Sequence, residues 1–105
     1  MTKTPPHPSQ NIINHILYSV SAASGIPVAA LRGQGRTRGA AYARFIAVLI
    51  LHENCRWLSL AELAAAIGRK DHGSALHALS RARSLPHHDA AFAALLLKCQ
   101  WTAAA

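Results

Sequence analysis

The stretch RKDHGSALHA, residues 69–78, determines how the rest of the chain is interpreted. It combines two cations, an acid and an imidazole with small residues, and apolar side chains recur behind it at helical spacing. Ala75, Leu79 and Ala82 share one side, with Leu76 beside them. The opposite face carries Lys70, Gly73, Ser74, His77 and Arg81. We therefore predict a helix with one face that packs and another that enters a nucleic-acid groove.

A second helix is predicted immediately before this stretch. Ser59 and Glu62 have the spacing of a capping box, in which each side chain satisfies a backbone N–H of the other residue. Gly68 ends this short helix, and Asp71 is placed to cap the next one. Its buried side is formed by Leu60, Leu63, Ala64 and Ile67. A helix, a glycine-containing turn and a second helix form a helix-turn-helix.

The remaining sequence predicts further helices around this pair. Residues 1–8 contain three prolines and are expected to form a disordered lead. Helices follow from Ser9, as a cap, to Gly25, from Pro27 to Leu31, from residue 40 to about 55, and from Asp89 to Trp101. Residues 102–105 are expected to be a disordered tail. The fold class is therefore all-α, a single helical domain over residues 9–101.

The charge of the chain is strongly positive and concentrated in its middle. Eleven lysine and arginine residues oppose four acidic ones, for a formal net charge of +7, and nine of the cations lie between Arg32 and Arg83. The segment 32–39 holds three glycines and three arginines without an apolar residue. Such a loop can insert an arginine into a minor groove, or it can be a flexible, solvated connection. Arg44 is expected either at the DNA side or as an ordinary surface arginine.

Several other classes of function find little support. His72 and His77 are five residues apart and do not lie on one face of a helix. No further candidate ligands cluster near them, so no metal site is predicted. His52 and Cys55 have no orienting partner, so no enzyme is predicted. The cysteines are expected to be reduced thiols. Apolar runs such as residues 45–51 are too short to span a membrane, and no signal peptide is visible, so a cytoplasmic protein is expected.

Four blocks of sequence together resemble one known family. They are 25–28 with Leu31, 36–38 with residues 43–44, 58–63, and 70–78. The last is close to the signature G-x-R-D-H-[ST]-T-V-x-H-A. The chain resembles, over about residues 11–85, the C-terminal DNA-binding domain (domain IV) of DnaA, the bacterial replication initiator.

The resemblance implies a fold, a partner and a set of contacts. The fold would be a Trp-repressor-like helical bundle, and the partner would be double-stranded DNA at the DnaA box, consensus TTATNCACA. Arg36 would enter the minor groove, Asp71 and His72 would read bases in the major groove, and Lys70 and Ser74 would bind phosphates. The full set of predicted DNA-binding residues is Arg36, Arg38, Arg44, Arg69, Lys70, Asp71, His72, Gly73, Ser74, His77 and Arg81. The role would be replication control or transcription regulation at the nucleoid.

Three departures from the family pattern predict weaker or shifted specificity. Gly73 replaces a threonine or serine, Lys70 replaces an arginine and loses its bidentate fork, and the loop 32–35 is poorer in cations. The sequence also contains no GxxxxGK[ST] phosphate loop, so no nucleotide or other cofactor is expected. A stand-alone DnaA-like protein and an excised domain both fit this observation.

Two alternative functions stay open at this point. One is a protein-interaction module that uses the apolar C-terminal helix, with a weak homodimer through Phe92, Leu96 and Trp101. The other is a basic nucleic-acid binder without sequence preference, whose affinity would disappear at high salt.

Overall fold

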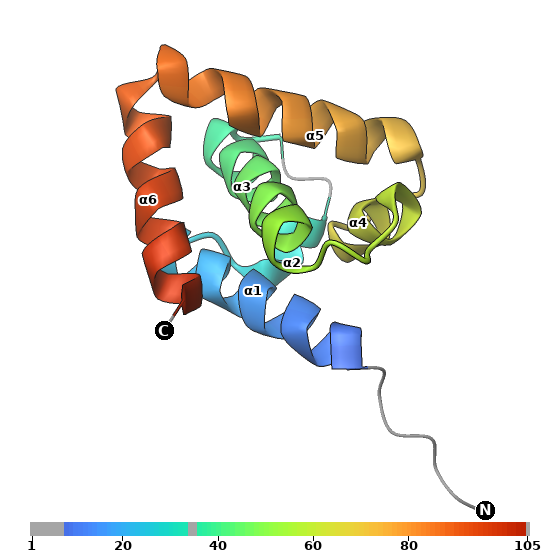
Figure 1. The fold of residues 1–105 in the computed structure, drawn as a ribbon. Helices are drawn as coiled ribbons and strands as arrows, with labels where there is room; N and C mark the ends of the chain where they lie inside the picture. The colour runs from blue at the N-terminus through green and yellow to red at the C-terminus, as the bar shows by residue number, and fades with distance from the viewer. Residues whose placement is uncertain (1–7, 34–35, 105) are drawn as a thin grey trace, which may run out of the picture.

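The computed structural model describes residues 8–33 and 36–104, and this part of the chain consists of helices joined by short connections, without strands (Figure 1). In chain order the elements are α1 (Pro8–Ser24), α2 (Val28–Arg32), α3 (Arg38–Asn54), α4 (Leu60–Ala66), α5 (His72–Ser84), a 3₁₀ turn η1 (Leu85–His87) and α6 (Ala90–Ala104). The prediction of an all-α bundle is therefore confirmed.

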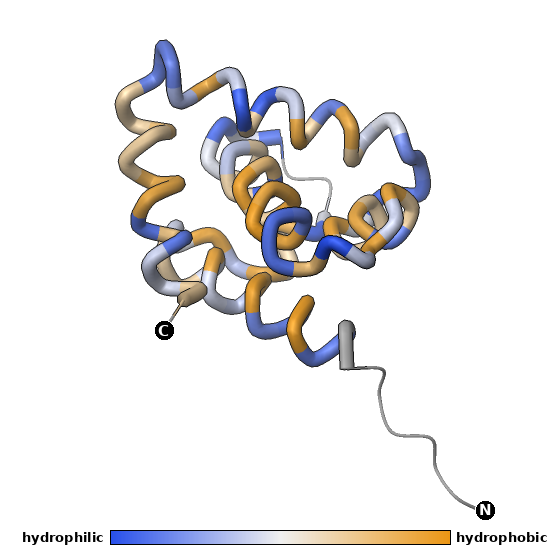
Figure 2. The backbone as a smooth tube through the Cα atoms, viewed as in Figure 1, coloured by the Kyte–Doolittle hydropathy of each residue, from blue (hydrophilic) through white to orange (hydrophobic). Residues whose placement is uncertain are grey.

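The central element is α3, which lies between α5 on one side and α1 on the other (Figure 1). Apolar residues surround the middle of this helix, and Figure 2 shows that part of α3 as a hydrophobic segment inside the bundle. The residues buried from α3 are Ala40, Ala43, Arg44, Ile46, Ala47, Val48, Leu49, Ile50 and Leu51. Because each fully buried aliphatic side chain contributes roughly 1.5–3 kcal/mol, α3 supplies the largest share of the core.

Local capping residues determine where the helices begin and end. Gly25 ends α1 with a positive φ of 76°, as predicted. The expected cap Ser9 instead lies inside α1, which begins at Pro8. Thr37 caps α3, because its side chain accepts a hydrogen bond of 3.1 Å from the Ala40 amide. This cap starts α3 at Arg38, two residues before the predicted beginning.

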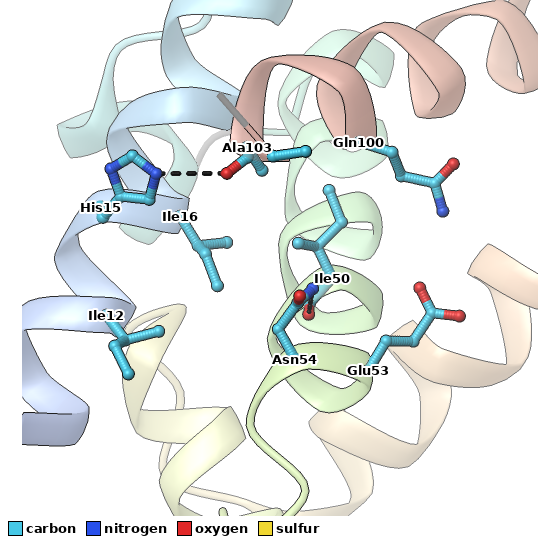
Figure 3. A pocket seen from close by; sticks show the side chains of 9 residues that line it. Ile12, His15, Ile16, Ile50, Glu53, Asn54, Gln100 and Ala103 are labelled. Carbon is cyan, nitrogen blue, oxygen red and sulfur yellow. Dashed lines mark hydrogen bonds between the residues drawn. The ribbon is translucent and has the colours of Figure 1, made fainter.

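The C-terminal helix is longer than predicted. Residues 102–104, expected in a disordered tail, belong to α6, since alanines favour helix and the Thr102 hydroxyl donates to the Lys98 carbonyl at 2.9 Å. A ring nitrogen of His15 also hydrogen-bonds the carbonyl of Ala103 at 3.2 Å, which ties α6 to α1 (Figure 3). Residue 105 and residues 1–7 of the predicted lead lie outside the described residues.

The apolar residues of α6 divide between the core and the surface. Phe92 and Cys99 are fully buried, and the Phe92 ring meets the edge of Tyr42 at a centroid distance of 5.0 Å. Trp101, expected to pack on the core, is 81% exposed. Leu76 of α5, expected beside the apolar face, is likewise 54% exposed, because it lies one step around the helix from the buried stripe.

Candidate nucleic-acid interface

The turn between α4 and α5 has the predicted helix-turn-helix chemistry. Ser59 and Glu62 form the capping box, with both of its hydrogen bonds 3.1 Å long. At the other end of α4, Gly68 takes a φ of 72° and donates to the Ala65 carbonyl at 3.0 Å. This left-handed glycine reverses the chain so that α5 leaves at an angle to α4.

The same turn rests on the end of α2. A Cβ atom added at Gly68 would lie 1.9 Å from the carbonyl oxygen of Arg32, so only glycine allows the approach. Arg32 is the first residue of the glycine- and arginine-rich loop. The helix-turn-helix and the start of the basic loop are therefore in direct backbone contact.

The first turn of α5 presents the residues predicted to read bases. Asp71 caps the helix as expected, with Oδ1 accepting from the Gly73 amide at 2.9 Å. Asp71, His72 and Gly73 are all exposed. The cap uses one carboxylate oxygen and leaves Oδ2 to accept a hydrogen bond from a donor outside the chain. A carboxylate held in this way is suited to the exocyclic amine of cytosine.

Two of the predicted DNA-binding arginines lie behind this surface. Arg44 is only 8% exposed, so the expectation of an ordinary surface arginine is wrong, and its expected contact with DNA stays a prediction. Its Nε donates to the Leu31 carbonyl at 3.0 Å, and its Nη2 contacts the Gly33 carbonyl at 3.4 Å. Arg69, which is half-buried, donates to the same Gly33 carbonyl at 2.9 Å. Both guanidinium groups thus hold the residues where the basic loop begins.

Burial changes the acidity of Arg44. Removal of the guanidinium from water lowers its pKa, and the neighbouring positive charge of Arg69 lowers it further. Two cations held close together indicate a region of concentrated positive potential.

The other predicted residues are distributed along the exposed side of α5 and the loop. Lys70, His77 and Arg81 are exposed on α5, and Ser74 is half-buried. The His77 ring meets Phe45 of α3 edge-on at 5.7 Å, which fixes the position of the imidazole. Arg36 of the loop and Arg38, the first residue of α3, are both exposed, while residues 34–35 lie outside the described part.

A tyrosine–aspartate pair joins the start of α3 to the start of α6. The Tyr42 hydroxyl donates to Oδ2 of Asp89, and Oδ1 of Asp89 accepts from the Phe92 amide at 3.0 Å. The bond to Tyr42 lowers the pKa of Asp89, and the same bond raises the pKa of Tyr42. The positive charges of Arg38 and Arg81 partly oppose this rise in the pKa of Tyr42.

Sequence reasoning did not identify three of these features. Thr37 could have been found, because a threonine directly before a helix is a common cap. The contacts of Arg69 with Gly33 and of Tyr42 with Asp89 join residues 36 and 47 positions apart. Such long-range pairs leave no pattern in a single sequence.

Another hollow lies away from these cations. It has a volume of about 500 Å³ and opens between α1, the end of α3 and the end of α6 (Figure 3). Its polar lining includes His15, Glu53, Asn54 and Gln100. Among the described residues no three histidine, cysteine or acidic side chains gather as metal ligands would, and none of the helices described is long and apolar enough to cross a membrane.

The exposed first turn of α5, the glycine turn behind it and the adjoining cations define a helix-turn-helix DNA-binding domain. The family model described as the bacterial DnaA protein helix-turn-helix matches residues 13–81, more than half of the chain. The chain belongs to this family. The family resemblance predicted from the sequence is confirmed, and with it a helix-turn-helix domain that binds double-stranded DNA. No curated protein matches the chain.

Proposed function

We propose that the chain binds duplex DNA in a sequence-dependent way at DnaA-box-like sites. In this proposal the N-terminal turn of α5 enters the major groove, and the loop arginine Arg36 enters the adjacent minor groove. The observation that carries the proposal is the exposure of Asp71, His72 and Gly73 on a turn in backbone contact with the start of the basic loop. A fixed spacing between two reading elements is required to engage neighbouring grooves of one site.

The charges around the site support the same docking. Of the four acidic residues, only Asp71 belongs to the predicted DNA-facing set, where its carboxylate has a specific base to contact. Lys70 adjoins Asp71 in the chain, and Arg81 lies further along the exposed side of α5. With Arg38, these cations would contact phosphates. A box occupied by this chain would be withheld from an initiator, so the proposed role is regulation of replication initiation or of transcription.

The test is fluorescence anisotropy with a duplex containing TTATCCACA and a scrambled duplex of equal composition, at two salt concentrations. A preference of about tenfold or more (about 1.4 kcal/mol) that persists at the higher salt is expected. Equal binding of both duplexes that vanishes with salt would leave a basic binder without sequence preference.

One observation favours the second candidate, a weak homodimer through α6. The exposed residues of α6 include a stripe with the 4–3 spacing of helix pairs, formed by Ala90, Ala94, Leu97, Trp101 and Ala104. This stripe replaces the predicted surface, since Phe92 is buried. Sedimentation velocity tests it. A dimer that Trp101→Ala dissociates supports the candidate, and a monomer at all concentrations rejects it.

A further inference from the structure

The hollow between α1, the end of α3 and the end of α6 contains none of the residues predicted to bind DNA. Its volume of about 500 Å³ lies within the range typical of ligand sites, roughly 300–1,000 Å³. Figure 3 shows Ile16 and Ile50 between His15 and Glu53, so the floor is apolar and the rim is polar. A partner seated in this hollow would not compete with a duplex for the same side chains.

Among the described residues, Glu53 is the acidic residue whose side chain has no intramolecular partner. The chain has four acidic residues, and the other three stabilise local structure. Asp71 caps α5, Glu62 completes the capping box of α4, and Asp89 accepts hydrogen bonds from the Tyr42 hydroxyl and from the first turn of α6. The charge of Glu53 is therefore available to a cation from outside the chain.

Two helix ends add negative partial charge to the hollow. α3 ends at Asn54 and α6 ends at Ala104, and both residues line the hollow. The free carbonyl groups at a helix C-terminus together carry about half a negative elementary charge. The Asn54 amide nitrogen donates to the Ile50 carbonyl at 2.8 Å, which leaves Oδ1 to accept a further hydrogen bond. Since no lysine or arginine is among the described residues that line it, the hollow is electronegative in a chain of formal net charge +7.

The lining indicates which kind of cation fits. Ile12 is 36% exposed at the edge of the apolar floor, so an aliphatic stem can be covered there while its charge faces Glu53. One carboxylate balances one positive charge, whereas a polyamine would bring further charges that a chain of net charge +7 repels. Oxygen atoms of Glu53, Asn54 and Gln100 come from two helices. They suit the three divergent donors of an ammonium group better than the planar fork of a guanidinium group.

We propose that this hollow is the docking site of a partner protein that inserts a lysine side chain. The stem of the lysine packs on the isoleucines, and its ammonium group lies beside Glu53. Apolar residues of the partner next to this lysine cover the rest of the floor. The inference goes beyond the proposed DNA binding and does not depend on it. It gives the chain a second surface, through which another protein can be held next to a bound duplex.

The test uses three acetylated and amidated pentapeptides in amide NMR titrations of the full chain at constant ionic strength. The central residue, which lies between two leucines and two outer serines, is lysine, norleucine or arginine. Norleucine has the straight stem of lysine without the ammonium group, so it reports the apolar contact alone. The lysine peptide should give saturable shifts at Glu53 and Gln100. Its affinity should exceed that of the norleucine peptide by about fivefold, the upper range for one exposed ion pair.

Three variants of the chain separate the charge from the apolar contact. Glu53→Gln should remove the preference for lysine and leave the affinity for the norleucine peptide unchanged. The fold should be kept, because an acidic side chain does not stabilise the last turn of a helix. Glu62→Gln is the matched control, since it removes one negative charge while glutamine still completes a capping box. It should keep the preference. Ile12→Ala should weaken the lysine and norleucine peptides alike, because it changes the floor and not the charge.

Three outcomes would contradict the docking site. Equal affinities of the lysine and norleucine peptides, or no shifts around the hollow, overturn the proposal. A preference for lysine that survives in Glu53→Gln overturns it as well, because the ammonium group would then be bound elsewhere. An arginine peptide that binds at least as tightly as the lysine peptide overturns the assignment of a lysine. None of these titrations contains DNA, so the proposed DNA binding is decided by its own test.

Discussion

Asp71 caps α5 and is proposed to read a base, and a substitution can separate these two roles. Serine caps a helix about as well as aspartate but carries no charge. We expect Asp71→Ser to keep the free energy of unfolding within about 0.5 kcal/mol of the parent. Under the proposed docking, discrimination at the cytosine that the carboxylate would contact should fall by about 1–3 kcal/mol. Urea unfolding and anisotropy on single-base variants of the box measure the two effects. Unchanged discrimination would mean that the carboxylate does not read a base.

Gly73 is the residue where the reading turn departs most from its family. A Cβ atom added there would lie 3.4 Å from both oxygens of Asp71, which is ordinary contact, and its φ needs no glycine. Gly73→Thr should therefore stabilise the chain by about 0.3 kcal/mol through helix propensity. It should also increase preference for the thymine-containing box. Equal affinity of parent and variant for all thymine substitutions would contradict the second expectation.

At the scale of elements, two left-handed glycines allow a matched comparison. Gly68 and Gly25 have φ values of 72° and 76°, but only Gly68 has a backbone atom within reach of an added Cβ. Gly25→Ala should cost about 1–2 kcal/mol, the strain of a left-handed residue. Gly68→Ala should cost clearly more and displace the turn from α2. Urea unfolding measures both, and equal costs would show that the contact between the turn and Arg32 does not matter.

The hydrogen bond between Tyr42 of α3 and Asp89 before α6 should make the free energy of unfolding depend on pH. Hydrogen bonds from Tyr42 and from the Phe92 amide lower the pKa of Asp89 in the folded chain. The stability contributed by Asp89 is therefore present above the ordinary aspartate pKa and lost as pH falls through the lowered value. Asp89→Asn should lose less stability between pH 7 and pH 3 than the parent in urea titrations. An identical loss of stability in both proteins would exclude the Tyr42–Asp89 pair as a source of the pH dependence.

Elements with local signals could be predicted from the sequence, and those set by tertiary contact could not. The cap at Asp71, the box at Ser59 and the stop at Gly25 depend on residues within four positions, so their pattern is visible in the chain. The burial of Arg44 depends on carbonyls of α2 that approach it only after folding. The end of α6 depends in part on His15, 88 residues away from Ala103.

The whole molecule contains two buried thiols that can report its opening. Cys55 and Cys99 are fully buried. Burial raises the pKa of the Cys55 thiol above its ordinary value, and it raises the pKa of Cys99 to about 11. At neutral pH both should resist a thiol reagent until the chain unfolds. Labelling followed by mass spectrometry across a urea series should therefore parallel the loss of helical circular dichroism. Reaction of Cys99 alone in native buffer would instead show that α6 detaches before the rest unfolds.

The contacts made to the carbonyl groups at the end of α2 should also affect the free energy of DNA binding. Arg44 from α3 and Arg69 from the turn both reach Gly33, and Gly68 lies against Arg32. The loop and α5 therefore share one set of restraints. Under the proposed docking, ordering either one prepares the other, so the minor-groove and major-groove contacts bind cooperatively, and the coupling is reciprocal. A DNA site that offers contacts in only one groove lacks the free energy of this coupling in addition to the missing contacts. The difference in affinity between a complete box and half of a box is therefore larger than the missing contacts alone would give.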